Sequence, residues 1–119
     1  MKPARDYHDD LLHDLKDPRE AIAYLNAALE EGDKEAFLLA VRHVVEAQGS
    51  MTQLARVSKL HRVSLYKILS KRGNPGIDSL MSVLDAIGAR LCIAPQRRHR
   101  NVAAQHFFNS TLSAQQTLQ

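Results

Sequence analysis

Apolar residues recur every three or four positions along five stretches of this chain, and polar residues fill the positions between them. That spacing is the period of an amphipathic α-helix. Residues that commonly cap or end helices separate the stretches. The expected helices cover residues 17–31, 33–49, 51–58, 62–71 and 78–88, with N-caps at Asp17, Asp33, Ser50 and Asp78. The pattern therefore predicts an all-α fold.

The same spacing predicts which side of each helix is buried. Residues 33–49 carry apolar side chains over the widest arc, so we expect this helix to be central in the bundle. Glu20 and Gln53 stand three residues after Asp17 and Ser50, which is the spacing of a capping box. The positions expected to face inward are Ile22, Leu25, Leu29, Phe37, Leu38, Val41, Val44, Val45, Gln48, Leu54, Ala55, Val57, Leu65, Ile68, Leu69, Leu80, Leu84 and Ile87.

The two ends of the chain lack this helical pattern. Residues 1–16 predict an extended arm with a helical turn around its leucines, residues 17–95 a single domain, and residues 96–119 a basic, flexible tail. Residues 89–95 predict a short strand, which cannot be stable alone. We expect that strand to pack over the bundle, or to pair with the arm or with a second copy, and we favour a place near a dimer interface.

Residues 50–77 predict two short helices joined by a turn at Lys59, Leu60 and His61. One side of the second helix is apolar, whereas the opposite side is polar and basic. No acidic residue occurs between Glu46 and Asp78. This arrangement favours a polyphosphate partner such as DNA.

The amino-acid sequence of this stretch resembles that of a known family. The matching segments are Thr52-Gln53-Leu54-Ala55, Leu60, Leu65-Tyr66-Lys67-Ile68-Leu69-Ser70 and Gly73-Asn74-Pro75, with Asp17-Pro18, Tyr24-Leu25-Asn26, Glu30-Glu31-Gly32-Asp33 and Ile87-Gly88 outside it. Together they resemble the Xre/lambda-repressor type of helix-turn-helix, and within it the HigA-like addiction-module antidote group, from about Leu15 to Pro95. The resemblance implies a lambda-repressor-like five-helix bundle. It also implies an antitoxin that binds a small basic RelE/HigB-like toxin, blocks its RNA cleavage and represses their shared promoter.

Two residues of the turn depart from that family. Lys59 stands where the family usually has glycine, and His61 where it usually has a serine or threonine cap. A lysine at a positive φ costs about 1 kcal/mol. We therefore expect a reshaped turn and a slightly re-aimed recognition helix.

In a helix-turn-helix, the start of the second helix enters the major groove. Arg62 is the first candidate base reader, because its guanidinium can pair with both O6 and N7 of guanine, and Val63 fits a thymine methyl. Lys67, Ser64 and His61 are further base or phosphate contacts, which the resemblance also places at the DNA. The alternative for Arg62 and Lys67 is a solvated face. Because one motif reads few base pairs, we expect a homodimer on a palindromic operator.

A second group of residues is expected to set register by binding phosphates. It comprises Lys71, Arg72, the backbone around Asn74, and the helix start at Met51 and Gln53. Tyr66 is also a DNA candidate, although we favour a role in which its ring covers the flank of the helix. The tail cluster at 97–100 is either a phosphate contact or merely solvated.

Charge divides the chain into two halves. Residues 1–49 hold 6 Lys or Arg against 11 Asp or Glu, and residues 50–119 hold 10 against 2, which gives −5 and +8. The basic half suits an anionic partner, and the acidic half, through residues 1–16 and 17–31, suits a basic toxin. A solvated acidic face is the alternative for the first half. A stand-alone Xre-type repressor without a toxin is the alternative for the whole chain.

Other classes of protein find little support. The single Cys92 excludes an internal disulfide, fits a reducing compartment and is expected in the core. Asp9 and His13 would share a helix face, yet no second pair completes a metal site. We expect no cofactor and no catalysis, with a metal nuclease built near His8 as the competing enzyme. No apolar run reaches the roughly 18 residues that span a bilayer, and the N-terminus lacks a signal-peptide core, so we expect a cytoplasmic protein.

Overall fold

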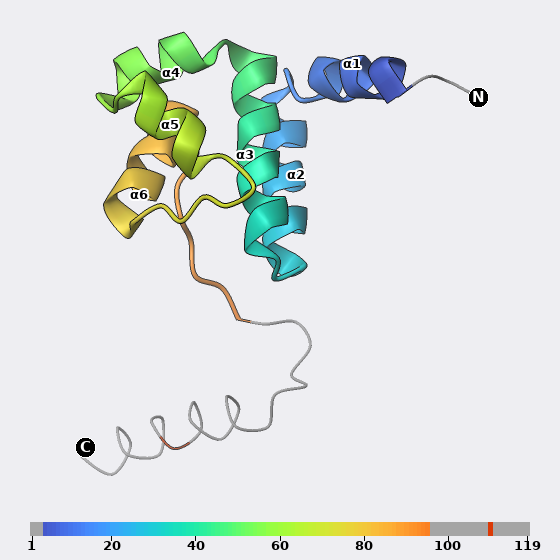
Figure 1. The fold of residues 1–119 in the computed structure, drawn as a ribbon. Helices are drawn as coiled ribbons and strands as arrows, with labels where there is room; N and C mark the ends of the chain where they lie inside the picture. Colours follow the sequence, from blue (N-terminus) through green and yellow to red (C-terminus); the bar gives the residue numbers. More distant parts are fainter. Residues whose placement is uncertain (1–3, 96–109, 111–119) are drawn as a thin grey trace.

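The computed structural model describes residues 4–95 and residue 110 of the 119-residue chain. Within these residues it contains helices and no strands, so the all-α prediction is confirmed for the described part (Figure 1). The helices are α1 (Ala4–Asp14), α2 (Pro18–Glu30), α3 (Lys34–Gln48), α4 (Met51–Ser58), α5 (Arg62–Ile68) and α6 (Ile77–Ala86).

The first helix was not expected. The arm predicted for residues 1–16 is wrong as an extended segment, because α1 is helical from Ala4 and contacts α3. The leucines near its end explain this difference. Leu15 is buried, and Leu11 and Leu12 are half-buried against the core, so packing on α3 stabilises a segment whose own periodicity is weak.

Aspartate caps begin the next two helices, as predicted. Asp17 accepts a hydrogen bond from the Arg19 amide, and Asp33 accepts one from the Glu35 amide, each at 2.9 Å. The capping box predicted for Glu20 does not form. The amide that it would satisfy, that of Asp17, already donates to the Asp14 carbonyl at 3.2 Å.

Helix α3 is the centre of the bundle, as predicted, and it contacts α1, α2 and α4. It buries Phe37, Leu38, Ala40, Val41, Val44, Val45 and Ala47. Gln48 was predicted to face inward but is exposed. Its amide would have required a buried partner, so solvent is the less costly place for it.

The buried side of α2 is rotated slightly from the predicted one, because two of its three buried residues lie one position earlier in the sequence than predicted. Leu25 is buried, but its buried neighbours are Ala21 and Ala28, whereas Ile22 and Leu29 are 40% and 48% exposed. Alanines allow the axes of α2 and α3 to approach closely, and the larger side chains are left at the rim. Val57 of α4 was also predicted to face inward and is exposed.

The end of the described chain departs further from the prediction. Helix α6 begins at Ile77 after Gly76, so Asp78 lies in its first turn and is not the cap. Val83 and Leu84 are buried, and Gly88 follows the helix at a φ of 81°. The strand predicted for residues 89–95 is absent, because no other described segment is available to pair with it. Cys92 is exposed there and is not a core residue. The tail predicted for residues 96–119 lies outside the described residues apart from residue 110.

Candidate nucleic-acid interface

Local hydrogen bonds stabilise the turn between α4 and α5. Lys59 adopts the left-handed conformation, with φ 62° and ψ 21°, so the expectation that its side chain would reshape the turn is wrong at this residue. The hydroxyl of Ser58 donates to the Leu54 carbonyl at 2.7 Å and accepts from the Leu60 amide at 3.4 Å. These bonds hold a lysine in a conformation that costs it about 1 kcal/mol.

Two leucines fix α5 to the bundle. Leu65 is 0% exposed and Leu69 is 2% exposed, and Ile68 between them is half-buried, as predicted. Helix α5 contacts α4, and α4 contacts α6 (Figure 1). The apolar side of α5 is therefore fully used in packing, which presents its other side to solvent.

Helix α5 ends earlier than predicted, at Ile68. The hydroxyl of Ser70 donates to the Lys67 carbonyl at 2.6 Å, and the Gly73 amide donates to the Ser70 carbonyl at 2.9 Å, so the chain turns away. Gly73 was predicted to supply a left-handed cap, but its φ is not positive. A Cβ atom there would instead collide with the Ile68 carbonyl oxygen, which explains the glycine.

The solvent side of α5 carries the predicted base readers. We call the surface formed by His61, Arg62, Val63, Ser64 and Lys67 the basic face; all five residues are exposed, Val63 by 78%. His61 takes the N-cap position without a side-chain hydrogen bond to the helix. The His61 ring therefore does not cap the helix, whereas the hydroxyl of a serine or threonine at this position would.

Tyr66 joins the basic face to the rest of the protein. The guanidinium carbon of Arg62 lies 5.7 Å from the centre of the Tyr66 ring, and that of Arg42, on α3, lies 5.6 Å from it. Both distances are typical of cation–π contacts. The Tyr66 ring thus lies against one arginine of α5 and one of α3. Its favoured role, covering the flank of α5, stays a prediction. The motif gave no signal for Arg42, which lies outside it.

The predicted phosphate contacts fall into two places. Lys71, Arg72 and Asn74 are exposed on the loop between α5 and α6. At the start of α4, the Met51 side chain is buried, so that residue offers only its backbone amide. The Gln53 amide already donates to the Ser50 hydroxyl at 3.2 Å, which confirms the Ser50 cap.

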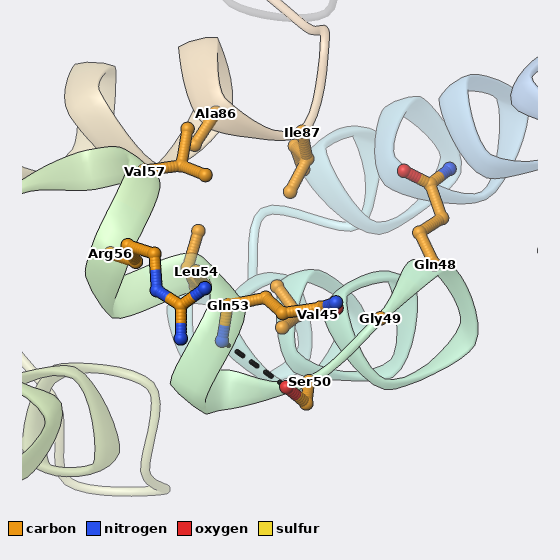
Figure 2. Close-up of a pocket in the computed structure, with 10 residues that line it drawn as sticks. All are labelled: Val45, Gln48, Gly49, Ser50, Gln53, Leu54, Arg56, Val57, Ala86 and Ile87. Atoms are coloured by element: carbon orange, nitrogen blue, oxygen red, sulfur yellow. Dashed lines mark hydrogen bonds between the residues drawn. The ribbon is translucent and has the colours of Figure 1, made fainter.

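A hollow lies beside that helix start. It has a volume of about 360 Å³ and is formed by the end of α3, by α4 and by α6 (Figure 2). Val45, Leu54, Val57, Ala86 and Ile87 give it an apolar lining, with Arg56 and the Ser50–Gln53 bond at its border.

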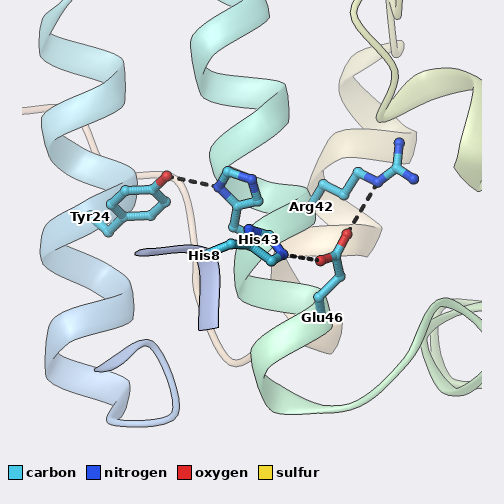
Figure 3. Close-up of polar contacts among 5 residues, drawn as sticks. All are labelled: His8, Tyr24, Arg42, His43 and Glu46. Carbon is cyan, nitrogen blue, oxygen red and sulfur yellow. Dashed lines mark hydrogen bonds and ion pairs between the residues drawn. The ribbon is translucent and has the colours of Figure 1, made fainter. Parts of the chain in front are cut away.

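A polar cluster connects α1, α2 and α3 (Figure 3). Glu46 lies 3.5 Å from His8 and 3.3 Å from Arg42, and the Tyr24 hydroxyl is hydrogen-bonded to His43 Nδ1 at 2.8 Å. Burial lowers the pKa of His43; His8 and Arg42 lower it further, and Glu46 opposes them. Burial, together with the charge of Glu31, raises the pKa of the Tyr24 hydroxyl.

Two further features, a metal site and a membrane-spanning helix, are absent from the described residues. Over residues 4–95 and 110, no three His, Cys, Asp or Glu side chains are grouped so that they could hold a metal ion. In the same part of the chain, no helix combines the length and the apolar character that crossing a membrane requires.

These features describe a helical protein with a short, exposed helix that carries basic residues. Residues 7–95 match a family described as probable addiction module antidote proteins. An uncharacterized protein of Haemophilus influenzae is 33% identical over 88 residues, which are 74% of this chain and 90% of that protein. No solved structure matches the chain. The chain belongs to the family of probable addiction module antidote proteins.

Proposed function

We propose that this protein is the antitoxin of a toxin-antitoxin pair, which neutralises a RelE/HigB-like toxin and represses its own promoter by sequence-specific DNA binding. Membership of the antidote family supports the first activity. The basic face supports the second, and it is the observation that carries the proposal. Five exposed residues lie along a short helix and at its N-cap, in a stretch without acidic residues from Ala47 to Ile77.

On DNA, α4 and α5 act as a helix-turn-helix of the Xre/lambda-repressor type. Helix α5 enters the major groove, where Arg62 pairs with guanine and Val63 contacts a thymine methyl. Lys67 lies one turn further along the same face. Lys71, Arg72 and the backbone at Asn74 bind phosphates, together with the amide at Met51 and the Gln53 side chain. The left-handed Lys59 supports this assignment, because it keeps a tight turn between the two helices.

The toxin binds the acidic half of the chain. Residues 1–49 carry a net charge of −5, which complements a basic partner. Helix α2 also exposes Ile22 and Leu29, which are seven positions apart and so lie on one side of the helix. Exposed apolar side chains surrounded by charge are typical of a protein–protein contact. Charge and exposed apolar area thus favour α2 as the docking helix.

We propose that the protein binds DNA as a homodimer, in which each protomer contacts one half-site of a palindromic operator. Ile77 and Met81 support a contact through α6, since both are more than half exposed and lie one turn apart. Leu91 and Ile93, in the segment once expected to form a strand, are exposed as well. We favour a place for that segment near the dimer interface.

We further propose that the chain has no catalytic activity. The competing hypothesis is a metal nuclease built near His8. A nicking assay on supercoiled plasmid with magnesium and the purified chain tests it, and we expect no nicks above the buffer control. Nicking that disappears in a His8→Ala variant would contradict the proposal.

The test of the whole proposal is co-expression of the tagged chain with the small gene beside its own, followed by size-exclusion chromatography with light scattering. We expect a stoichiometric complex with a basic protein of similar size. A dimer that elutes alone and still binds a selected DNA duplex would instead establish a stand-alone Xre-type repressor. A chain that binds neither would contradict both readings.

A further inference from the structure

Arg42 lies outside the α4–α5 pair and nevertheless contacts it. Its guanidinium carbon is 5.6 Å from the centre of the Tyr66 ring, and the guanidinium carbon of Arg62 is 5.7 Å from the same point. Arg42 belongs to α3, the central helix, whereas Arg62 is the first residue of α5. The Tyr66 ring therefore links a residue of the central helix to the proposed base reader.

Arg42 is itself held in place. Its Nε atom lies 3.3 Å from Glu46 Oε1, one helical turn along α3, and the other oxygen of Glu46 lies 3.5 Å from His8 Nε2 on α1 (Figure 3). Two guanidinium groups beside one ring repel each other. The carboxylate of Glu46 compensates the charge of Arg42, which allows both cations to share the ring of Tyr66.

We propose that Arg42 is a positioning residue for DNA reading, which acts on Arg62 through the ring of Tyr66 and does not itself touch DNA. The inference rests on the proposed DNA binding. A guanidinium must lie in the plane of guanine to pair with O6 and N7 together. The contact with Arg42 of α3 fixes the Tyr66 ring, and the ring restricts the rotamers of Arg62 before DNA binds. Arg62 therefore loses less conformational entropy on binding.

The test uses the full chain and a duplex selected from a random pool of double-stranded DNA, with a scrambled duplex of the same composition as the reference. Arg42→Gln is expected to reduce the preference for the selected duplex roughly 2- to 5-fold, the change that corresponds to one exposed cation–π contact. The dependence of affinity on salt is expected to stay the same, because no phosphate contact is lost.

A double-mutant cycle separates positioning from direct contact. In an Arg62→Ala background, Arg42→Gln is expected to have no further effect, because no guanidinium remains to be positioned. Lys34→Gln is the matched control: it removes one positive charge from the exposed start of α3, and it is expected to leave the preference unchanged. The thermal midpoint of each variant shows that it is folded.

Tyr66 supplies a second pair of variants, in which Arg42 itself is not substituted. Tyr66→Phe keeps the aromatic face and is expected to keep the preference, whereas Tyr66→Leu is expected to reduce it as much as Arg42→Gln does. Equal losses for Arg42→Gln in both backgrounds, with a shallower salt dependence, would show a direct phosphate contact and overturn the inference alone. An unchanged preference in Arg42→Gln would also overturn it. A pool that yields no preferred duplex would overturn the proposed DNA binding itself.

Discussion

The two halves of this protein use their charged groups in opposite ways. In α1–α3, Glu46 pairs with His8 and with Arg42, and His43 is bonded to Tyr24. Over residues 50–95, by contrast, the structure shows no ion pair for the exposed Lys and Arg side chains. These residues belong to the basic half, which has few acidic residues to pair with them. Cations without acidic partners within their own fold are available to an external anion. The comparison thus separates a half in which a carboxylate pairs with cations of its own fold from a half in which exposed cations have no such partner.

The largest expected effect comes from the packing that holds the basic face. Leu65→Ala deletes a side chain that is 0% exposed, and it should lower the free energy of unfolding by about 2–5 kcal/mol, measured by urea denaturation. Val63→Ala, on the exposed side of the same helix, should change it by less than about 0.5 kcal/mol. Equal effects of the two substitutions would mean that α5 does not pack as described.

Removing cations from the basic half should distinguish base reading from phosphate binding. Arg62→Ala should weaken binding to a selected duplex by about 1–3 kcal/mol and relax the choice at one base pair. Arg72→Ala should weaken all duplexes alike and lower the slope of affinity against salt by about one. Fluorescence anisotropy at several salt concentrations measures both. Equal losses on selected and random DNA for Arg62→Ala would remove its reading role.

The strained turn gives an effect in the opposite direction. Lys59→Gly should stabilise the fold by about 1 kcal/mol, because glycine adopts a φ of 62° without steric cost. Lys59→Ala is the control, since it removes the charge and keeps the strain, and it should give no such gain. A Lys59→Gly variant that is no more stable than Lys59→Ala would show that the turn is not strained at this residue.

The smallest effect concerns pH and the polar cluster of the acidic half. Burial lowers the pKa of His43, so the unfolded chain takes up a proton more readily than the folded one. Stability should therefore fall as the pH drops below about 6.5, the pKa of histidine in the unfolded chain. His43→Gln should reduce that fall, measured by thermal melting between pH 8 and pH 5.

Tyr24→Phe is the control for this last effect. It removes the hydrogen bond to His43 but keeps the ring that covers it, so the dependence on pH should persist while overall stability decreases. A His43→Gln variant whose melting temperature falls with pH as steeply as that of the original protein would assign the dependence to other groups.

Local signals in the sequence predicted much of this fold. The caps Asp17, Asp33 and Ser50 bond to amides two or three residues ahead, so their effect is visible in a short window. The packed side of α5 was predicted correctly for the same reason, since Leu65 and Leu69 are one turn apart. Such features depend on few residues and little on the remainder of the chain.

Features set by contacts between distant segments were missed. The spacing of apolar residues in α2 is compatible with burial of either of two neighbouring sides of the helix. The close approach of α3 decides between them, so that Ala21 and Ala28 are buried while Ile22 and Leu29 stay exposed. Helix α1 forms because α3 covers its leucines. In the candidate site, the motif pointed to Arg62 and Lys67, but the contact of Arg42 with Tyr66 joins two helices that no local pattern relates.

The most direct test of the account is a nuclear magnetic resonance titration of the isotopically labelled chain with a selected duplex, followed amide by amide. We predict that the shifts concentrate between residues 59 and 74, with residue 42 responding through the Tyr66 ring, and that α2 is unchanged. Shifts centred on α2, or shifts of equal size with scrambled DNA, would contradict the claim that the basic face reads sequence.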